Sequence, residues 1–252
     1  MMRKSNLKRG GAMKNYIFVL IIFSASLFSQ NTDTQERINF IPKAGGLNYG
    51  EYNVNFRIYQ NGGMLTRMVF GVLQGIDIGF SWDIYSLIGT ETAHARDPNL
   101  YLKFDIFRGN QLLPAISAGY DNQGYGLWND EKEKYEIPAL GFFATFSKEL
   151  FIPKFYVTAG LNYNKDAFEK NKDFPESLAC FAGFNIKPSR LGIFAEALNI
   201  GKGWDYSQIN AGIVFEFTEG LNFMLAFENV SEADKIRKDV ERTFEILYKG
   251  AF

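Results

Sequence analysis

The feature that most limits what this chain can fold into is a run of short segments in which apolar and polar residues alternate. From residue 47 to the C-terminus there are about twelve such segments. Side chains of an extended strand point alternately to its two faces, so each segment predicts a strand with one apolar face. In GIDIGFSWDIY, for example, Ile78 and Phe80 fall on one face, and Asp77 and Ser81 fall on the other.

Each predicted strand is close to the roughly 9 to 11 residues that a tilted strand needs to cross a bilayer. The predicted strands span 47–60, 63–73, 76–89, 99–108, 114–121, 137–147, 154–164, 177–187, 190–200, 206–217, 220–229 and 242–252.

The connections between these segments alternate in length. Short connections such as KPS and TEG alternate along the sequence with long polar ones such as DNQGYGLWNDEKEKYE, and the tight QNGG is the exception. Short turns at one end and long loops at the other are typical of outer-membrane β-barrels, and a sheet in lipid must close because open edges would leave backbone groups unpaired. We therefore expect an all-β fold: a single closed antiparallel transmembrane β-barrel of about 12 strands in up-and-down meander order. A soluble secreted β-sandwich binding protein is the alternative.

The first 29 residues have the pattern of a secretory signal peptide. Five basic residues precede and flank the apolar run YIFVLIIFSASLF, and small residues that suit cleavage follow. The alternative is a retained anchor helix. We predict a signal peptide at 1–29, a lead-in segment at 30–46 and the barrel at 47–252, which implies export to a bacterial outer membrane.

Charge and composition exclude several classes of function. The chain has 27 basic and 28 acidic residues, and removing the five basic residues of the predicted signal peptide leaves 22 − 28 = −6. A net negative chain is a poor partner for nucleic acid, so none is expected. With one cysteine and one histidine, the sequence predicts no metal site and no cofactor. Cys180, within LACFAGF, is expected to be buried or to face lipid.

If the apolar faces point to lipid, the polar faces collect in the barrel interior. Residues of both charges are predicted there, forming a candidate polar cluster in the lumen: Arg57, Asp77, Asp83, Lys103, Asp105, Glu196, Glu216 and Glu228. If the loop near His94 closes symmetrically, Asp83 and Asp105 lie opposite each other on neighbouring strands, with Lys103 one step along the same face. Arg67 faces lipid or the lumen, depending on the length of the first turn.

Two interpretations of this interior stay open. One is a network of ion pairs and hydrogen bonds that fills the barrel, because buried charges must be paired. The other is a narrow water-filled channel, in which small residues such as Gly160 and Gly212 leave room for a solute. Acidic residues outnumber basic ones in the predicted interior, which disfavours selection for anions.

The C-terminal segment ERTFEILYKGAF places an apolar residue at every second position. Phe244, Ile246 and Tyr248 share one strand face, and the chain ends on Phe252. This pattern resembles the C-terminal signature of outer-membrane proteins, which implies recognition by the barrel-assembly machinery.

His94, in TETAHARDP, is the one histidine that a catalytic site could use. It could act as the general base of a barrel hydrolase or lipid-modifying enzyme, but no sequence motif places a serine beside it. A solvated loop histidine is the simpler interpretation, and we do not predict an enzyme.

Residues 41–148 carry a more particular likeness. They contain a glycine pair at 62–63, the motif G-x-x-x-G-I-x-I-G at 71–79, the tripeptide LIG after the third strand, and PAISAGYDNQGYG. In these motifs the chain resembles YjbH-like bacterial outer-membrane β-barrels. The resemblance implies a barrel tied to exopolysaccharide production or export. The functions expected are thus structural, secretion-associated or small-solute channel roles, with outer-membrane lipid and a polysaccharide or secretion partner as the contacts.

Overall fold

The computed structural model describes residues 36–90, 92–129, 134–150, 152, 154–164, 177–233 and 239–252. The predicted signal peptide lies outside these residues. Twelve long strands dominate the fold: β1 Glu51–Tyr59, β2 Gly63–Leu73, β3 Ile76–Tyr85, β5 Asn99–Phe107, β6 Ala115–Asp121, β9 Gly141–Glu149, β10 Phe155–Tyr163, β11 Leu178–Ile186, β12 Leu191–Ile200, β13 Gln208–Thr218, β14 Leu221–Glu228 and β15 Glu241–Ala251.

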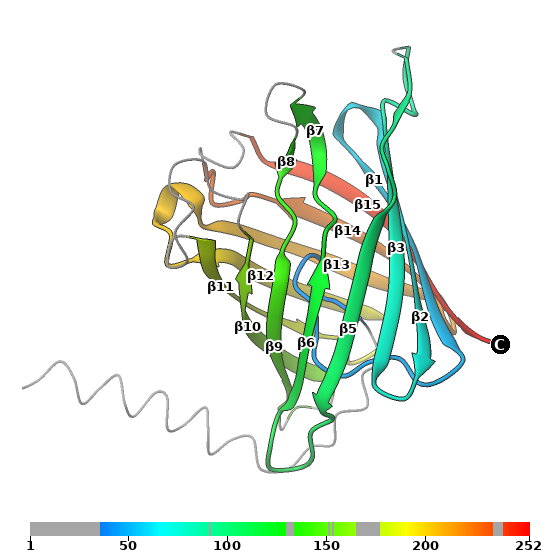
Figure 1. Cartoon of the computed structure of the whole chain (residues 1–252), viewed down its shortest axis with the longest axis vertical. Coiled ribbons are helices and arrows are strands. Elements are labelled where there is room, and N and C mark those ends of the chain that lie inside the picture. The colour runs from blue at the N-terminus through cyan, green and yellow to red at the C-terminus, as the bar shows by residue number, and fades with distance from the viewer. Residues whose placement is uncertain are drawn as a thin grey trace, which may run out of the picture.

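These strands form one closed ring (Figure 1). The sheet order runs β2-β1-β15-β14-β13-β12-β11-β10-β9-β6-β5-β3, and pairing of β2 with β3 completes the circle. Each long strand pairs antiparallel with its predecessor and successor, and the last strand pairs with the first. The expected closed 12-stranded antiparallel meander is confirmed.

The smaller elements lie between the long strands. The two-residue strand β4 (His94–Ala95) pairs with β3, and β7 (Tyr125–Asn129) forms a separate hairpin with β8 (Lys134–Ile137). Two single-turn 3₁₀ helices, η1 (Gln60–Gly62) and η2 (Trp204–Tyr206), sit in connections. None of the helices in the described ranges is long and apolar enough to span a membrane.

The two ends of the barrel differ as the sequence predicts. One end, called here the turn end, carries the short connections at 74–75, 108–114, 187–190 and 219–220, together with the start of β1 and the C-terminus. The opposite end, called here the loop end, carries η1, β4, the β7–β8 hairpin and η2. A three-residue turn through η1 joins β1 to β2, and this length places Arg67 in the lumen, where it is buried.

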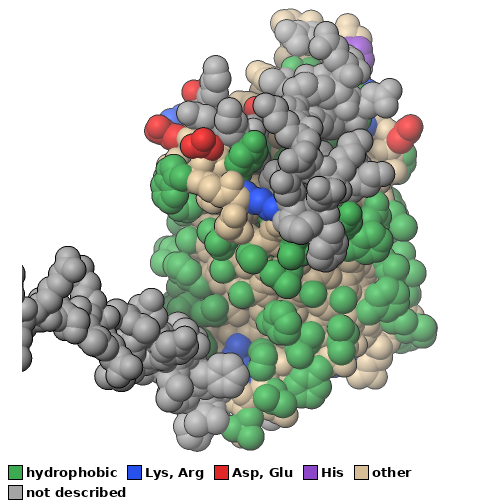
Figure 2. Space-filling model, turned by 60° about the vertical axis from the view of Figure 1, so that its left-hand side comes forward, with side chains coloured by type: hydrophobic (Ala, Val, Ile, Leu, Met, Phe, Trp, Pro, Cys, Tyr) green, Lys and Arg blue, Asp and Glu red, His purple; other side chains and the backbone are tan. Residues whose placement is uncertain are grey.

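The outer wall of the barrel is apolar. On β3, Ile78, Phe80 and Trp82 are 40–47% exposed, while Asp77 and Ser81 on the opposite face of the strand are buried. Figure 2 shows hydrophobic side chains covering the visible wall, with acidic side chains gathered towards one end. An exposed apolar band around a closed barrel, with polar residues inside, is the surface of a protein that sits in lipid. The chain is a transmembrane β-barrel.

Three strand boundaries differ from the prediction by four residues: the third strand ends at Tyr85 instead of residue 89, and two other strands begin later than predicted. The first strand begins at Glu51, because Leu47 leaves the wall and is buried inside the barrel. The sixth long strand begins at Gly141, because Ile137 belongs to the β7–β8 hairpin. In both places an apolar residue next to a strand packs elsewhere, which alternation within the sequence cannot reveal.

Candidate functional site

The barrel lumen is occupied by the chain's own N-terminal segment. Residues 36–48, called here the lumen segment, run inside the ring of strands before entering β1 (blue in Figure 1). The segment turns back on itself, since Ile38 N–H donates to Ile41 O at 3.1 Å and Lys43 N–H donates to Glu36 O at 2.9 Å. It corresponds to most of the predicted lead-in at 30–46, for which the sequence predicted no position.

The tip of the lumen segment is held by one carboxylate. Glu196, in the middle of β12, is 2% exposed and accepts hydrogen bonds from Phe40 N–H at 3.1 Å and Ile41 N–H at 3.2 Å. Asn39 N–H lies 3.4 Å from the same carboxylate, and Asn210 on β13 donates to it at 2.9 Å. A single acidic side chain thus supplies the acceptors for a run of backbone donors that make no strand pairing.

The returning limb of the lumen segment uses the opposite wall. Ala44 N–H donates to Ser147 Oγ at 2.8 Å, and Gly45 N–H donates to Ser117 Oγ at 3.1 Å. The next two N–H groups go to carboxylates: Gly46 to Asp105 at 2.9 Å and Leu47 to Asp77 at 3.1 Å. Irregular backbone at membrane depth is tolerated only where such partners satisfy it. Side chains of the barrel wall therefore hold the backbone of this segment in one position through hydrogen bonds.

Three groups of buried charges tie the segment to the wall. In the first, Arg57 on β1 donates to Asn39 Oδ1 at 2.8 Å, forms an ion pair with Glu245, and lies 3.7 Å from Glu228. In the second, Lys103 pairs with Asp77 at 3.1 Å.

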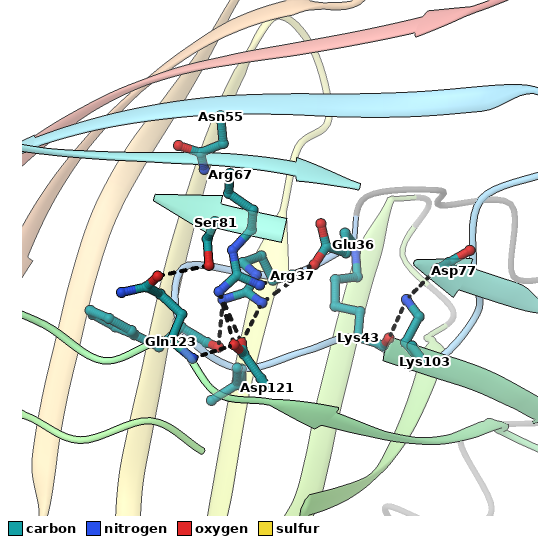
Figure 3. Close-up of polar contacts among 12 residues, drawn as sticks. Glu36, Arg37, Lys43, Asn55, Arg67, Asp77, Ser81, Lys103, Asp121 and Gln123 are labelled. Carbon is teal, nitrogen blue, oxygen red and sulfur yellow. Dashed lines mark hydrogen bonds and ion pairs between the residues drawn. The ribbon is translucent and has the colours of Figure 1, made fainter. Parts of the chain in front are cut away.

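The third group joins two arginines to one aspartate (Figure 3). Arg37 of the lumen segment and Arg67 of β2 reach Asp121 at 3.0 and 2.9 Å. Glu36 lies 3.3 Å from Arg37 and 3.6 Å from Arg67. All four side chains are 10% exposed or less, so each charge is compensated within the barrel rather than by water.

Apolar packing completes the filling of the lumen. Ile38, Ile41 and Leu47 of the lumen segment are at most 3% exposed and join a cluster of inward-facing aromatic side chains. Its wall members include Tyr101, Phe143, Phe181 and Phe194. The interior cluster predicted from the sequence included none of these rings, because it was selected for charged residues. The available signal was an aromatic residue at a strand position that otherwise carries the inward-facing polar residues.

The inward glycines do not leave room for a solute, as one interpretation of the sequence required. Phe181 pairs across the strands with Gly160, and Phe194 pairs with Gly212. A Cβ at Gly160 would lie 2.3 Å from the Phe181 ring, and one at Gly212 would lie 2.6 Å from the Phe194 ring. Each glycine thus makes space for a neighbouring ring.

The predicted interior residues are distributed among these contacts. Arg57, Asp77, Lys103, Asp105, Glu196 and Glu228 meet the lumen segment or its charge partners, as described above. Asp83 instead accepts a hydrogen bond from Tyr59 at 2.6 Å near the loop end, and Glu216 pairs with Lys187 at 2.6 Å at the turn end.

One expected juxtaposition is wrong. Asp83 and Asp105 do not face each other, because the register of β3 and β5 pairs Asp77 with Lys103. Asp105 lies beyond that pair towards the turn end, where its N–H donates to Gly75 O at 2.8 Å. The connection that contains β4 leaves β3 at Tyr85, so the two strands pair several residues away from the assumed register, and Asp77 rather than Asp83 faces a residue of β5 with a charged side chain, Lys103.

The C-terminal strand carries the predicted apolar face. Phe244 and Tyr248 are 39% and 45% exposed on the outer wall, Ile246 is partly buried between them, and Phe252 is 82% exposed. The Tyr52 ring lies 6.1 Å from Tyr248 and 6.4 Å from Phe252. This placement fits the predicted assembly signal, whose recognition stays a prediction.

His94 stands apart from the lumen. It lies exposed on β4, opposite Tyr85 of β3. Within the described ranges, no serine or carboxylate forms a hydrogen bond with it, and no three His, Cys, Asp or Glu residues converge as a metal site. The residues described therefore give the hydrolase alternative no nucleophile next to its base.

Comparisons with known proteins give weak similarities to porins. No family model and no curated protein matches the chain, so the YjbH-like resemblance finds no support there. Among solved structures, the chain is similar to the KdgM porin, with 10% identity, a TM-score of 0.45, and coverage of 80% of this chain and 99% of that one. A triple mutant of the Rhodopseudomonas blastica porin has 11% identity, a TM-score of 0.36 and coverage of 75% of this chain. The chain spans 55% of that porin's length.

Proposed function

We propose that this chain is an outer-membrane β-barrel channel that its own N-terminal segment holds shut. The observation that carries the proposal is the lumen segment, whose backbone donors are matched to acceptors on β3, β5, β6, β9 and β12. A general diffusion pore keeps its lumen clear, whereas this lumen is blocked by a segment with specific partners.

The number of strands supports a channel that would open when the lumen segment is withdrawn. Barrels of about 8 strands are filled by their own side chains, and those of about 16 to 18 strands leave a water-filled passage. This 12-stranded ring accommodates two limbs of extra polypeptide besides its inward side chains. Withdrawing the lumen segment would leave a passage lined by Arg57, Asp77, Lys103, Asp105 and Glu196.

The orientation follows the usual arrangement of such barrels. Both the entry to β1 and the C-terminus lie at the turn end, so this end faces the periplasm and the loop end faces outward. An exported precursor with the predicted signal peptide at 1–29 would reach this location.

The YjbH-like resemblance implies an exopolysaccharide or secretion role, but no contact among the described residues supports that role in the way that the lumen segment supports a closed channel. A polysaccharide chain would need the lumen segment displaced before it could pass. Deleting the gene and measuring exported polysaccharide would test that role separately.

The test is planar-bilayer conductance of the refolded full chain and two variants. The full chain is expected to be closed for most of the time, and a variant lacking residues 36–47 is expected to conduct in stable steps. In the second variant, Ala44→Cys and Ser147→Cys in a Cys180→Ser background would cross-link the segment to β9, since Ala44 N lies 2.8 Å from Ser147 Oγ. This lock should remove residual openings until reductant is added.

The matched control is the locked variant after reduction, which differs only in the cross-link. A deletion variant that shows heat-modifiable mobility, and is therefore folded, but never conducts would refute the channel and leave a packed structural barrel.

A further inference from the structure

A cavity of about 410 Å³ remains between the lumen segment and the wall. The returning limb leans on β3, β5, β6 and β9, so the space is left on the opposite side, against β1, β10, β11 and β13–β15. Lys154, Lys187 and Gly220 line it from the short connections, and Lys249 lines it from the end of β15, so the cavity belongs to the turn end. Its volume lies within the range of small-molecule sites, about 300 to 1,000 Å³.

The inner end of the cavity holds an incompletely satisfied guanidinium group. Arg67 is 5% exposed and lines the cavity, and its Nη1 has no hydrogen-bond partner among the described residues. Glu36 lies 3.6 Å from this nitrogen, which is too long for a hydrogen bond. Arg37 also lines the cavity, and its buried Nε is likewise without a partner. Buried donors of this kind are normally satisfied, so both nitrogens are available to an acceptor that enters the cavity, either a water or a ligand.

The charges along the cavity favour an anion. Its lining contains five basic residues against two acidic ones, Glu36 and Glu216, but Arg37 and Arg67 share the carboxylates of Asp121 and Glu36. Lys187 is neutralised by Glu216 at 2.6 Å, and Lys249 by Glu51 at 2.9 Å. The exposed ammonium group of Lys154 forms no ion pair with a described residue and can attract an anion at the mouth.

Side-chain amides line the space between the mouth and the arginines. Asn185 has a buried Oδ1 without a hydrogen-bond partner among the residues described, and the Asn53 side chain also lines the cavity. Amides offer both donors and acceptors, so they suit the hydroxyl or second polar group of a small organic molecule.

We propose that this cavity binds a small organic anion, with its carboxylate on Arg67 and Arg37 and its other polar groups on Asn185 and Asn53. This binding goes beyond channel closure and is independent of it, because the cavity exists while the lumen segment is in place. An occupied site would hold a ligand between the segment and the wall.

The experiment is calorimetric titration of the refolded full chain in detergent with succinate and with its neutral diamide. Succinate should bind with a Kd of about 1 mM or tighter, and the diamide at least about tenfold more weakly, because the two differ in charge while keeping the same carbon skeleton. Arg67→Gln should weaken succinate binding by about tenfold or more, and Lys154→Gln by about threefold.

Controls keep the outcome independent of folding and of conduction. Lys202→Gln, in the connection between β12 and β13 at the loop end, makes the same charge change far from the cavity and should leave binding unchanged. If Arg67→Gln loses heat-modifiable mobility, Asn185→Leu replaces it. This change exchanges the amide for an apolar side chain of similar size and should weaken binding by about tenfold. Equal binding of succinate and diamide, no binding of either, or unchanged affinity in the Arg67 and Asn185 variants would overturn the proposal. None of these results depends on whether the barrel conducts.

Discussion

Replacing Glu196 with alanine should release the tip of the lumen segment while leaving the barrel intact. The carboxylate accepts two backbone N–H groups at 3.1 and 3.2 Å and approaches a third at 3.4 Å. A buried donor left unpaired costs about 1 to 3 kcal/mol, so two lost bonds amount to about 2 to 6 kcal/mol. Water entering the space left by the side chain recovers part of this, and we take about 3 kcal/mol as the loss in docking free energy.

The assay is hydrogen–deuterium exchange of the amides of residues 39–41. A loss of about 3 kcal/mol corresponds to exchange faster by about a hundredfold, if these amides exchange through undocking of the segment. Amides in the centres of β12 and β13 should keep their protection, because their bonds are to neighbouring strands. Glu196→Gln keeps one acceptor oxygen and should give a smaller increase.

Glu219→Ala is the matched control, since it removes the same charge from an exposed turn. Exchange at residues 39–41 that is equal in the Glu196→Ala and Glu219→Ala variants would refute the reasoning. It would mean that apolar packing alone holds the tip and that the carboxylate contributes nothing to docking.

Three further results are expected. Gly46→Val should lower the thermal midpoint and increase protease access to the lumen segment, because a Cβ there would lie 2.9 Å from the Asp77 carboxylate oxygens; an unchanged midpoint would contradict the described close contact. Phe181→Ala, at 1% exposure, should cost about 3 to 5 kcal/mol in unfolding free energy by urea titration in detergent, and a cost below about 1 kcal/mol would argue against a packed lumen. Removing Phe252 should reduce assembly in cells but leave refolding in detergent unchanged, as measured by heat-modifiable mobility in both settings; normal assembly in cells would contradict its predicted role.

The wall of the barrel could be predicted because a lipid-facing strand repeats every two residues. Each of the twelve expected segments overlaps one observed long strand, and residues such as Ile78 and Phe80 mark the outer face without knowledge of their neighbours. The alternation of short and long connections predicted the meander order, and the cost of open sheet edges in lipid predicted the closure.

The contents of the lumen could not be predicted in the same way. The sequence ERINFIPKAGGL has no strand period, and its position depends on acceptors from five separate strands. One signal was present: acidic residues outnumber basic ones in the predicted interior. The structure resolves part of this imbalance with backbone N–H groups. They satisfy Glu196 without an ion pair to any described residue, and they add donors to Asp105 and Asp77, which also pair with Arg108 and Lys103. Charge counting cannot find donors of this kind, because every sequence has them.

The meeting of the first and last strands has a practical consequence. Phe252 N–H donates to Gly50 O at 3.0 Å, so the end of the chain touches the start of the wall just after the lumen segment finishes. A short peptide link between these two positions would make the barrel chain circular, and new termini could then be created in an exposed loop. Residues 36–48 would then no longer be attached and could be added back as a synthetic peptide. Filling of the lumen would become a bimolecular reaction, with an affinity that can be titrated.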